Sequence, residues 1–285
     1  MTKRFKVACV QNTATRDLAA NVAALSDLVR EAAATGADLI ALPEHCSLME
    51  PRTEILHAHA VPLAEHPTLA RFRELAREVG AWLLVGSLPA RAPDGRIANC
   101  SILLDSDGAV IASYDKIHMF DVDLPTGERF RESDDFQSGS EARLVETPWG
   151  TLGMTVCYDL RFPALYRGLA QAGAQFLSIP AAFTKVTGDA HWRILVRARA
   201  IETGCFVFAP CQTGHHYGRR HTCGHSLIVD PWGEVLADGG VEVGVVSAEI
   251  DPARVAEVRA MIPSLEHDRP FSVAYPGKPR ISAVS

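Results

Sequence analysis

The chain has 285 residues, of which 47% are hydrophobic, and its formal net charge is −6 at pH 7. This acidic balance, without a basic stripe, argues against nucleic acid or an anionic membrane surface as a partner. No apolar run approaches the roughly 18 residues of a membrane span, and the apolar run near the N-terminus is too short for a signal peptide. The seven cysteines lack the spacing of a disulfide framework. We therefore expect a cytoplasmic protein with reduced thiols.

The first half of the chain alternates strand-like and helix-like segments. Apolar side chains recur at helical spacing over residues 17–35, and Gly36 follows as a helix-ending residue. Residues 68–79 show the same pattern and stop at Gly80. Strands are predicted at 5–11, 38–44, 82–88, 99–105 and 109–113.

The second half repeats this alternation without an intervening linker. A helix is predicted after Pro163, and another near 190–203 with Asp189 as its N-cap and Gly204 as its stop. Strands are predicted at 152–159, 174–183, 205–212, 225–237 and 244–250. We therefore expect one α/β domain over residues 1–285, in which two sheets pack together and helices cover them outside.

Three predicted strands end in a reactive side chain: Glu44, Lys116 and Cys157. Each has an ordinary structural explanation, as a helix cap, a surface lysine and a buried small hydrophobe respectively. Functional groups, however, often lie where a rigid element hands over to a loop. The joint placement therefore favours a carboxylate, an amine and a thiol that meet in one site.

The motifs around these residues resemble the nitrilase (carbon–nitrogen hydrolase) superfamily, from residue 5 to about residue 275. Glu44 in LPE, Lys116 in DKIH and Cys157 in CYDLRFP match its Glu–Lys–Cys triad, and Glu132 in FRES matches a second glutamate beside the lysine. The segments DKIHMFDVDLP, AFTKVTGDAHWRILVRARAIE and GHSLIVDPWGEV are most similar to the amidases of deaminated glutathione and of 2-oxo-acid ω-amides. The resemblance implies a four-layer α-β-β-α sandwich.

The same resemblance implies a cysteine amidohydrolase that acts on a small-molecule amide and uses neither a metal nor a cofactor. Cys157 is expected to attack the amide carbon, and Glu44 to accept the thiol proton and later activate water. Lys116 and the backbone N–H of Tyr158 are expected to stabilise the oxyanion. Glu132 is expected to keep Lys116 charged and aimed.

Other candidate residues are weighed against structural roles. The segment 215–225 carries His215, His216, His221, Cys223 and His225, but it lacks the paired spacing of a structural zinc site, so no metal is expected there. In the same segment, Arg219 and Arg220 are candidates to bind an anionic substrate. His191 is a third substrate-binding candidate. Asp159 and Arg161 are expected to form a structural ion pair, and the six remaining cysteines to pack in the core.

The sequence leaves two alternative functions open and also predicts self-association. The chain could hydrolyse a nitrile instead of an amide, or it could be a catalytically silent binding or scaffold protein. From about residue 264 onward the helix and strand signal is poor, and Phe271, Val273 and Tyr275 are expected to pack on a partner subunit in a homodimer or higher homo-oligomer.

Overall fold

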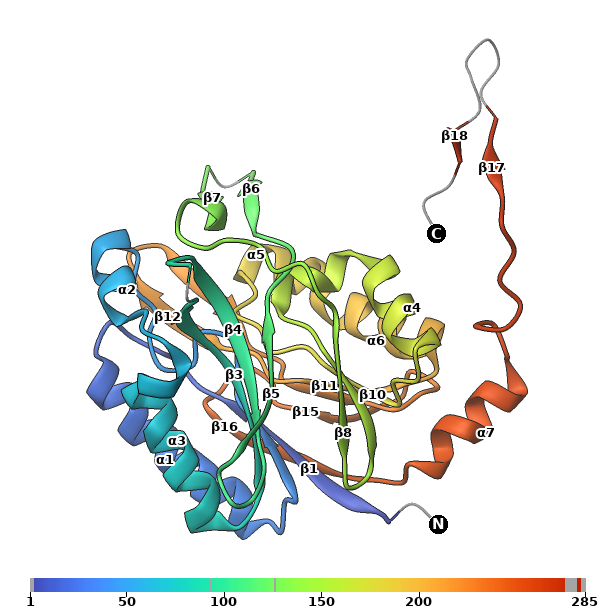
Figure 1. The fold of residues 1–285 in the computed structure, drawn as a ribbon, viewed down its shortest axis with the longest axis horizontal. Coiled ribbons are helices and arrows are strands. Elements are labelled where there is room, and N and C mark those ends of the chain that lie inside the picture. The colour runs from blue at the N-terminus through green and yellow to red at the C-terminus, as the bar shows by residue number, and fades with distance from the viewer. Residues whose placement is uncertain (1–2, 93, 126, 275–280, 283–285) are drawn as a thin grey trace.

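The computed structural model describes residues 3–92, 94–125, 127–274 and 281–282. Two six-stranded sheets lie face to face, and helices cover the outer side of each (Figure 1). The first sheet has the strand order β16 (Gly244–Ile250), β1 (Phe5–Gln11), β2 (Leu39–Ala41), β3 (Trp82–Arg91), β4 (Ile97–Leu104) and β5 (Val110–Asp115). The second has the order β15 (Val235–Asp238), β14 (Leu227–Val229), β11 (Phe206–Ala209), β10 (Phe176–Ser178), β9 (Gly150–Met154) and β8 (Arg143–Thr147). The expected four-layer α/β sandwich is confirmed.

Each sheet is covered by a pair of helices on its outer face. On the first sheet these are α1 (Leu18–Ala34) and α3 (Pro67–Val79), and on the second they are α4 (Pro163–Gln171) and α6 (Arg193–Thr203) (Figure 1). The helix ends follow the sequence signals, because Gly80 and Gly204 close α3 and α6 in the left-handed conformation that glycine adopts without strain. Helix α7 (Ala253–Met261) follows β16.

The alternation of side chains along β1 shows that the first sheet is buried on both faces. Val7 and Cys9 belong to the apolar core between the two sheets, whereas Ala8 and Val10 belong to the core beneath the helices of the first sheet. Because successive strand residues point to opposite faces, a strand buried on both sides is apolar throughout. The core between the sheets continues through the second sheet to α4 and α6.

The strand directions bring the predicted reactive residues to one edge. β2 is parallel to β3, while β4 is antiparallel to both β3 and β5. β5 therefore runs in the same direction as β2, and the residues after β2 and β5 lie at the same end of the first sheet. Those residues are Glu44 and Lys116.

Several predicted boundaries differ from the structure. The predicted strand 38–44 is shorter, since β2 ends at Ala41, and the predicted strand 152–159 ends at Met154 because Cys157 opens a short 3₁₀ turn (Cys157–Arg161). Asp189 is not an N-cap. The helical backbone already begins with α5 (Lys185–Thr187) and continues through a π-helical turn (Gly188–Trp192), where Asp189 pairs with Lys185 at 3.0 Å.

Smaller elements lie outside the two six-stranded sheets. They are α2 (Thr53–His59), the 3₁₀ turns Leu63–Glu65 and Glu132–Asp134, and the hairpins β6 (Asp121–Asp123)–β7 (Arg129–Arg131) and β12 (Thr213–Tyr217)–β13 (Arg220–Cys223). β17 (Ser272–Val273) and β18 (Ile281–Ser282) pair far from the two sheets (Figure 1). Among the described helices, none has the length and apolar character needed to cross a membrane.

Candidate active site

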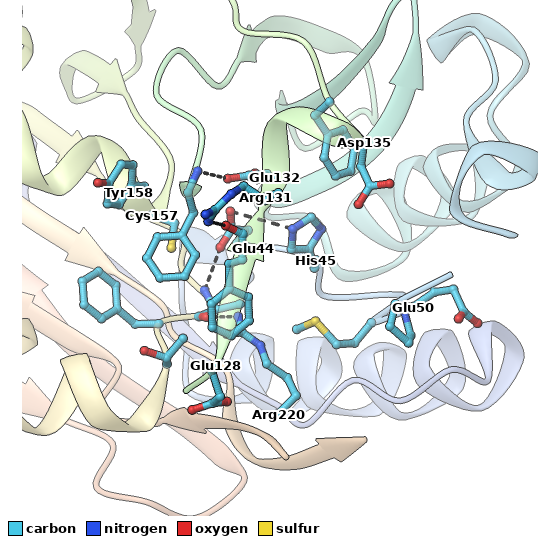
Figure 2. Close-up of a pocket in the computed structure, with 18 of the residues that line it drawn as sticks. Glu44, His45, Glu50, Glu128, Arg131, Glu132, Asp135, Cys157, Tyr158 and Arg220 are labelled. Carbon is cyan, nitrogen blue, oxygen red and sulfur yellow. Dashed lines mark hydrogen bonds and ion pairs between the residues drawn. The ribbon is translucent and has the colours of Figure 1, made fainter. Parts of the chain in front are cut away.

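Four predicted side chains meet at the edge where β2, β5 and β9 end. Lys116 Nζ donates to Glu44 Oε1 at 2.8 Å and to Glu132 Oε2 at 2.7 Å. Cys157 lies beside this cluster and interacts with the Glu44 carboxylate (Figure 2). The Glu44 and Lys116 side chains are 3% and 1% exposed, so their charges interact with little screening by water.

Cys157 is held at a strained turn. Its φ is +48°, in the left-handed region that non-glycine residues seldom adopt. Its N–H donates to the Pro180 carbonyl at 2.9 Å, and the Asp159 N–H donates to Val156 at 3.1 Å. The Tyr158 N–H takes part in neither bond and remains the candidate second oxyanion donor. Strain of this kind is often retained where a nucleophile has to face a cavity.

Asp159 fixes this turn, but it does so without Arg161, contrary to the predicted ion pair. The buried Asp159 carboxylate accepts the Val156 N–H at 2.8 Å and the Tyr114 hydroxyl at 2.7 Å. It also accepts the backbone N–H of His118 at 3.1 Å. Since Tyr114 and His118 flank Lys116 in sequence, Asp159 ties the cysteine turn of the second sheet to the lysine segment of the first.

Arg161 instead reaches toward aromatic rings. Its guanidinium carbon lies 5.2 Å from the centre of the Phe183 ring and 5.9 Å from that of Tyr158, and its Nη2 donates to His191 Nδ1 at 3.3 Å. His191, a substrate-binding candidate from the sequence, is exposed and is not among the described residues that line the cavity.

The charges of the cluster determine the resting protonation states. Burial raises the pKa of the Glu44 carboxyl, but the Lys116 ammonium, His45 and the hydrogen bonds from Cys157 and Lys116 together outweigh burial and lower that pKa to about 2. Burial lowers the pKa of Lys116, yet the carboxylates of Glu132 and Glu44 outweigh burial and raise it well above its usual range. The ionised Glu44 therefore lies against the Lys116 ammonium in the resting site.

The thiol itself is neutral at rest. Burial and the negative charge of Glu44 raise the pKa of Cys157 well above its usual range, although Lys116 acts in the opposite direction. A neutral thiol thus lies next to an ionised carboxylate, which is the arrangement that a general base needs.

The sequence analysis missed a buried asparagine in this cluster. Asn99 lies in β4, and its Nδ2 donates to Glu44 Oε1 and to Glu132 Oε1, at 3.0 Å in both cases. The Ala182 N–H, from the loop after β10, donates to Glu44 Oε2 at 2.9 Å. The one available signal was an amide at the start of the predicted strand 99–105, because a buried polar side chain needs partners.

A cavity of about 450 Å³ opens beside Cys157 (Figure 2). Its walls include both Arg219 and Arg220 from the β12–β13 region. Arg220 Nη2 donates to the Ala182 carbonyl at 2.7 Å, and its guanidinium lies over the Phe130 ring, 5.0 Å from the ring centre. Arg220 Nη1 is buried and has no partner among the described residues.

The histidine-rich segment 215–225 forms the β12–β13 hairpin and its flanks. His216 is buried between the Ala14 carbonyl, at 2.7 Å, and the Thr222 hydroxyl, at 2.8 Å. Among the described residues, the one group of His, Cys, Asp and Glu side chains with atoms close enough to share a metal is Glu44, His45 and Glu132. The Lys116 ammonium already bridges those two carboxylates, so a side chain supplies the positive charge there.

Comparisons with known proteins identify the family of this chain. The carbon–nitrogen hydrolase family profile matches residues 6–260. The chain belongs to the carbon–nitrogen hydrolase family. It is 40% identical over 277 residues to a deaminated glutathione amidase of Yersinia enterocolitica, and the match covers 96% of each chain.

Solved structures of the nitrilase superfamily share the fold. The Caenorhabditis elegans NitFhit protein superposes with a TM-score of 0.86 at 35% identity, over 99% of this chain and 72% of that one. A Saccharomyces cerevisiae member of branch 10 of the nitrilase superfamily gives a TM-score of 0.83 at 29% identity, over 92% of this chain and 95% of that one. The chain is thus a hydrolase of carbon–nitrogen bonds, of the amidase type.

Proposed function

We propose that this carbon–nitrogen hydrolase cleaves the terminal amide of a small, carboxylate-bearing molecule through a thioester on Cys157. The substrate belongs to the class of deaminated glutathione and the ω-amides of 2-oxo acids, and the products are an acid and an amine or ammonia. One observation carries the proposal: a neutral thiol on a strained turn lies beside the ionised Glu44, which Lys116 holds in place.

The proposed reaction has two halves. Cys157 Sγ attacks the amide carbon while Glu44 accepts the thiol proton, and the resulting oxyanion is stabilised by Lys116 and the Tyr158 N–H. The intermediate then expels the amine, which takes up the proton from Glu44, and a thioester remains. Water gives a proton to Glu44 and attacks the thioester, which releases the acid and restores the thiol. Such general-base assistance is typically worth about 10²–10⁴ in rate.

The cationic wall of the cavity supports an anionic substrate. Arg220 has an unpaired, buried N–H group, and Arg219 lines the same cavity. A carboxylate that leaves water needs a charge-assisted partner of this kind. Because the Yersinia relative is named a deaminated glutathione amidase, we propose a higher kcat/KM for deaminated glutathione than for 2-oxoglutaramate, and little activity on aliphatic nitriles.

The test is to measure amine or ammonia release with deaminated glutathione, 2-oxoglutaramate and an aliphatic nitrile. Cys157→Ala and Glu44→Gln are both expected to abolish turnover while circular dichroism stays unchanged. Intact-mass spectrometry of quenched wild-type reactions should show an acyl adduct, which Cys157→Ala lacks. A preference for the nitrile would favour a nitrilase, and a folded wild type without turnover would favour a silent binding protein.

A cytoplasmic location belongs to the same proposal. All seven cysteines are free and buried, as expected of a protein in a reducing compartment.

A further inference from the structure

The two carboxylates of the site differ in how many donors each oxygen atom accepts. Lys116 Nζ donates to Glu44 Oε1 at 2.8 Å and to Glu132 Oε1 at 2.9 Å. Asn99 Nδ2 donates to the same two oxygens, at 3.0 Å each. Nζ and Nδ2 therefore bridge the same pair of oxygen atoms, and each of these oxygens has two donors.

The remaining two oxygens are not equivalent. Glu132 Oε2 accepts from Lys116 Nζ at 2.7 Å and from the Phe120 N–H at 2.7 Å. Glu44 Oε2 accepts from the Ala182 N–H at 2.9 Å and, among the described residues, from no other N–H. A carboxylate oxygen has about two lone-pair sites. Three of the four oxygens are therefore saturated, and Glu44 Oε2 alone keeps a site for a proton.

We infer that Asn99 is a positioning residue that, together with Lys116, saturates the Oε1 atoms and so directs the proton of Cys157 to Glu44 Oε2. The inference rests on the proposed function, in which Cys157 is the nucleophile and Glu44 its base. In this step the proton leaves Sγ for Oε2, so the site exchanges a thiol and a carboxylate for a thiolate and a carboxyl group without a change in net charge. Each oxygen of Glu132 already accepts two hydrogen bonds.

The environment of Asn99 suits this role. The side chain is fully buried in β4, and the Asn99 carbonyl accepts the backbone N–H of Lys116 at 3.0 Å. Its Oδ1 is buried without a partner among the described residues. The reversed amide orientation would place Oδ1 against two carboxylates, which repel it. The amide is therefore held for its two N–H donors, and one residue fixes both glutamates and the lysine backbone.

Removal of the amide has a predictable electrostatic result. A hydrogen bond to the charged form of a carboxyl group lowers its pKa, so Asn99→Leu, which keeps the approximate volume and loses the donors, should raise the pKa of Glu44. Glu44 has to be ionised to accept the proton. The acid limb of kcat/KM should accordingly move to higher pH by about one unit or more, and kcat should fall about tenfold to a hundredfold.

The experiment measures pH profiles of kcat/KM with deaminated glutathione for wild type, Asn99→Leu and Asn99→Ala. Asn99→Ala is included so that a folded variant is available if leucine disturbs the strand. Ser101→Ala is the matched control, because Ser101 is also buried, lies two residues further on the same face of β4, and donates to the Val85 carbonyl rather than to a glutamate. Its profile should follow that of wild type.

The outcomes separate the inference from the proposed function. An acid limb that shifts in the Asn99 variants and not in Ser101→Ala supports the positioning role. Equal losses of kcat in folded Asn99 variants, with an unshifted acid limb, would overturn it. Full activity of Cys157→Ala would instead overturn the proposed function, whatever the Asn99 profiles show.

Discussion

At the scale of single residues, opposite charges set the protonation state of the Cys157 thiol, the proposed nucleophile. Glu44 and burial keep Cys157 protonated at rest, while Lys116 acts against them. The ionised Glu44 can then take the proton when substrate arrives, and no free thiolate is exposed beforehand. This arrangement differs from a cysteine with a lowered pKa, which is reactive toward many electrophiles before substrate binds.

One residue-scale prediction concerns the two arginines that line the cavity, Arg219 and Arg220. Replacement of Arg219 and Arg220 by glutamine should raise KM for deaminated glutathione roughly tenfold or more, because a charge-assisted hydrogen bond is lost. A neutral amide should be affected much less. Steady-state kinetics with both substrates measures the difference. Arg197→Gln is a suitable control, since Arg197 donates to the Gly233 carbonyl and is not among the described residues lining the cavity. Equal losses on both substrates would leave the two arginines with a structural role.

At the scale of elements, the decisive contact joins the turn after β9 to the end of β5. The Asp159 carboxylate holds the turn at Val156 and reaches Tyr114 and His118 on either side of Lys116. The ring of His118 also stacks on Phe162, with the ring centres 3.5 Å apart. These contacts fix the position of the Cys157 turn relative to the Lys116 segment.

Asp159→Ala should therefore impair both stability and catalysis. The change removes the acceptor of the buried Tyr114 O–H and of the Val156 N–H, at a cost of about 1–3 kcal/mol for each unsatisfied donor. Urea unfolding should show this loss, and kcat should fall more than KM changes. Asp189→Ala removes an exposed ion pair and should alter the free energy of unfolding little. A fully active and stable Asp159→Ala variant would show that the hydrogen bonds of Asp159 do not hold the Cys157 turn against the Lys116 segment.

At the scale of the whole molecule, the C-terminal segment leaves the body of the fold (Figure 1). Asp268 still pairs with Arg167 of α4 at 2.9 Å, but Phe271 and Val273 are 70% and 51% exposed. Tyr275, the third apolar residue of the predicted contact, lies outside the described residues. A two-stranded pairing such as β17–β18 is at best marginally stable alone in water, which favours a partner that covers it.

We accordingly predict that the protein forms a homodimer or a larger homo-oligomer through this segment. Light scattering at micromolar concentration should report more than one chain per particle, and Phe271→Asp with Val273→Asp should lower the measured mass. Val241→Asp, at an exposed apolar residue elsewhere, should leave the mass unchanged. A wild-type protein that is monomeric under these conditions would contradict the prediction.

Much of this fold could be predicted because the relevant signals are local. Apolar periodicity located α1 and α3, and Gly80 and Gly204 marked the ends of α3 and α6, where their φ angles are positive. Motifs around Glu44, Lys116 and Cys157 pointed to one site because each follows a strand. Glu44 and Lys116 follow β2 and β5, which run in the same direction in the first sheet, whereas Cys157 follows β9 of the second sheet. Local pattern was a poorer guide at Asp189, where helical backbone starts earlier than a capping residue suggests.

The sequence by itself determined the elements, the family and the residue types that can react. Only the tertiary structure decided which groups those residues meet. Asn99 lies 55 positions from Glu44, and Ala182 lies 138 positions away, yet both donate to its carboxylate. Asp159 pairs with Tyr114 across the two sheets rather than with the nearby Arg161. The physical reason is that periodicity reports whether a side chain is buried, whereas a buried polar group takes the partner that chain topology brings within hydrogen-bond distance.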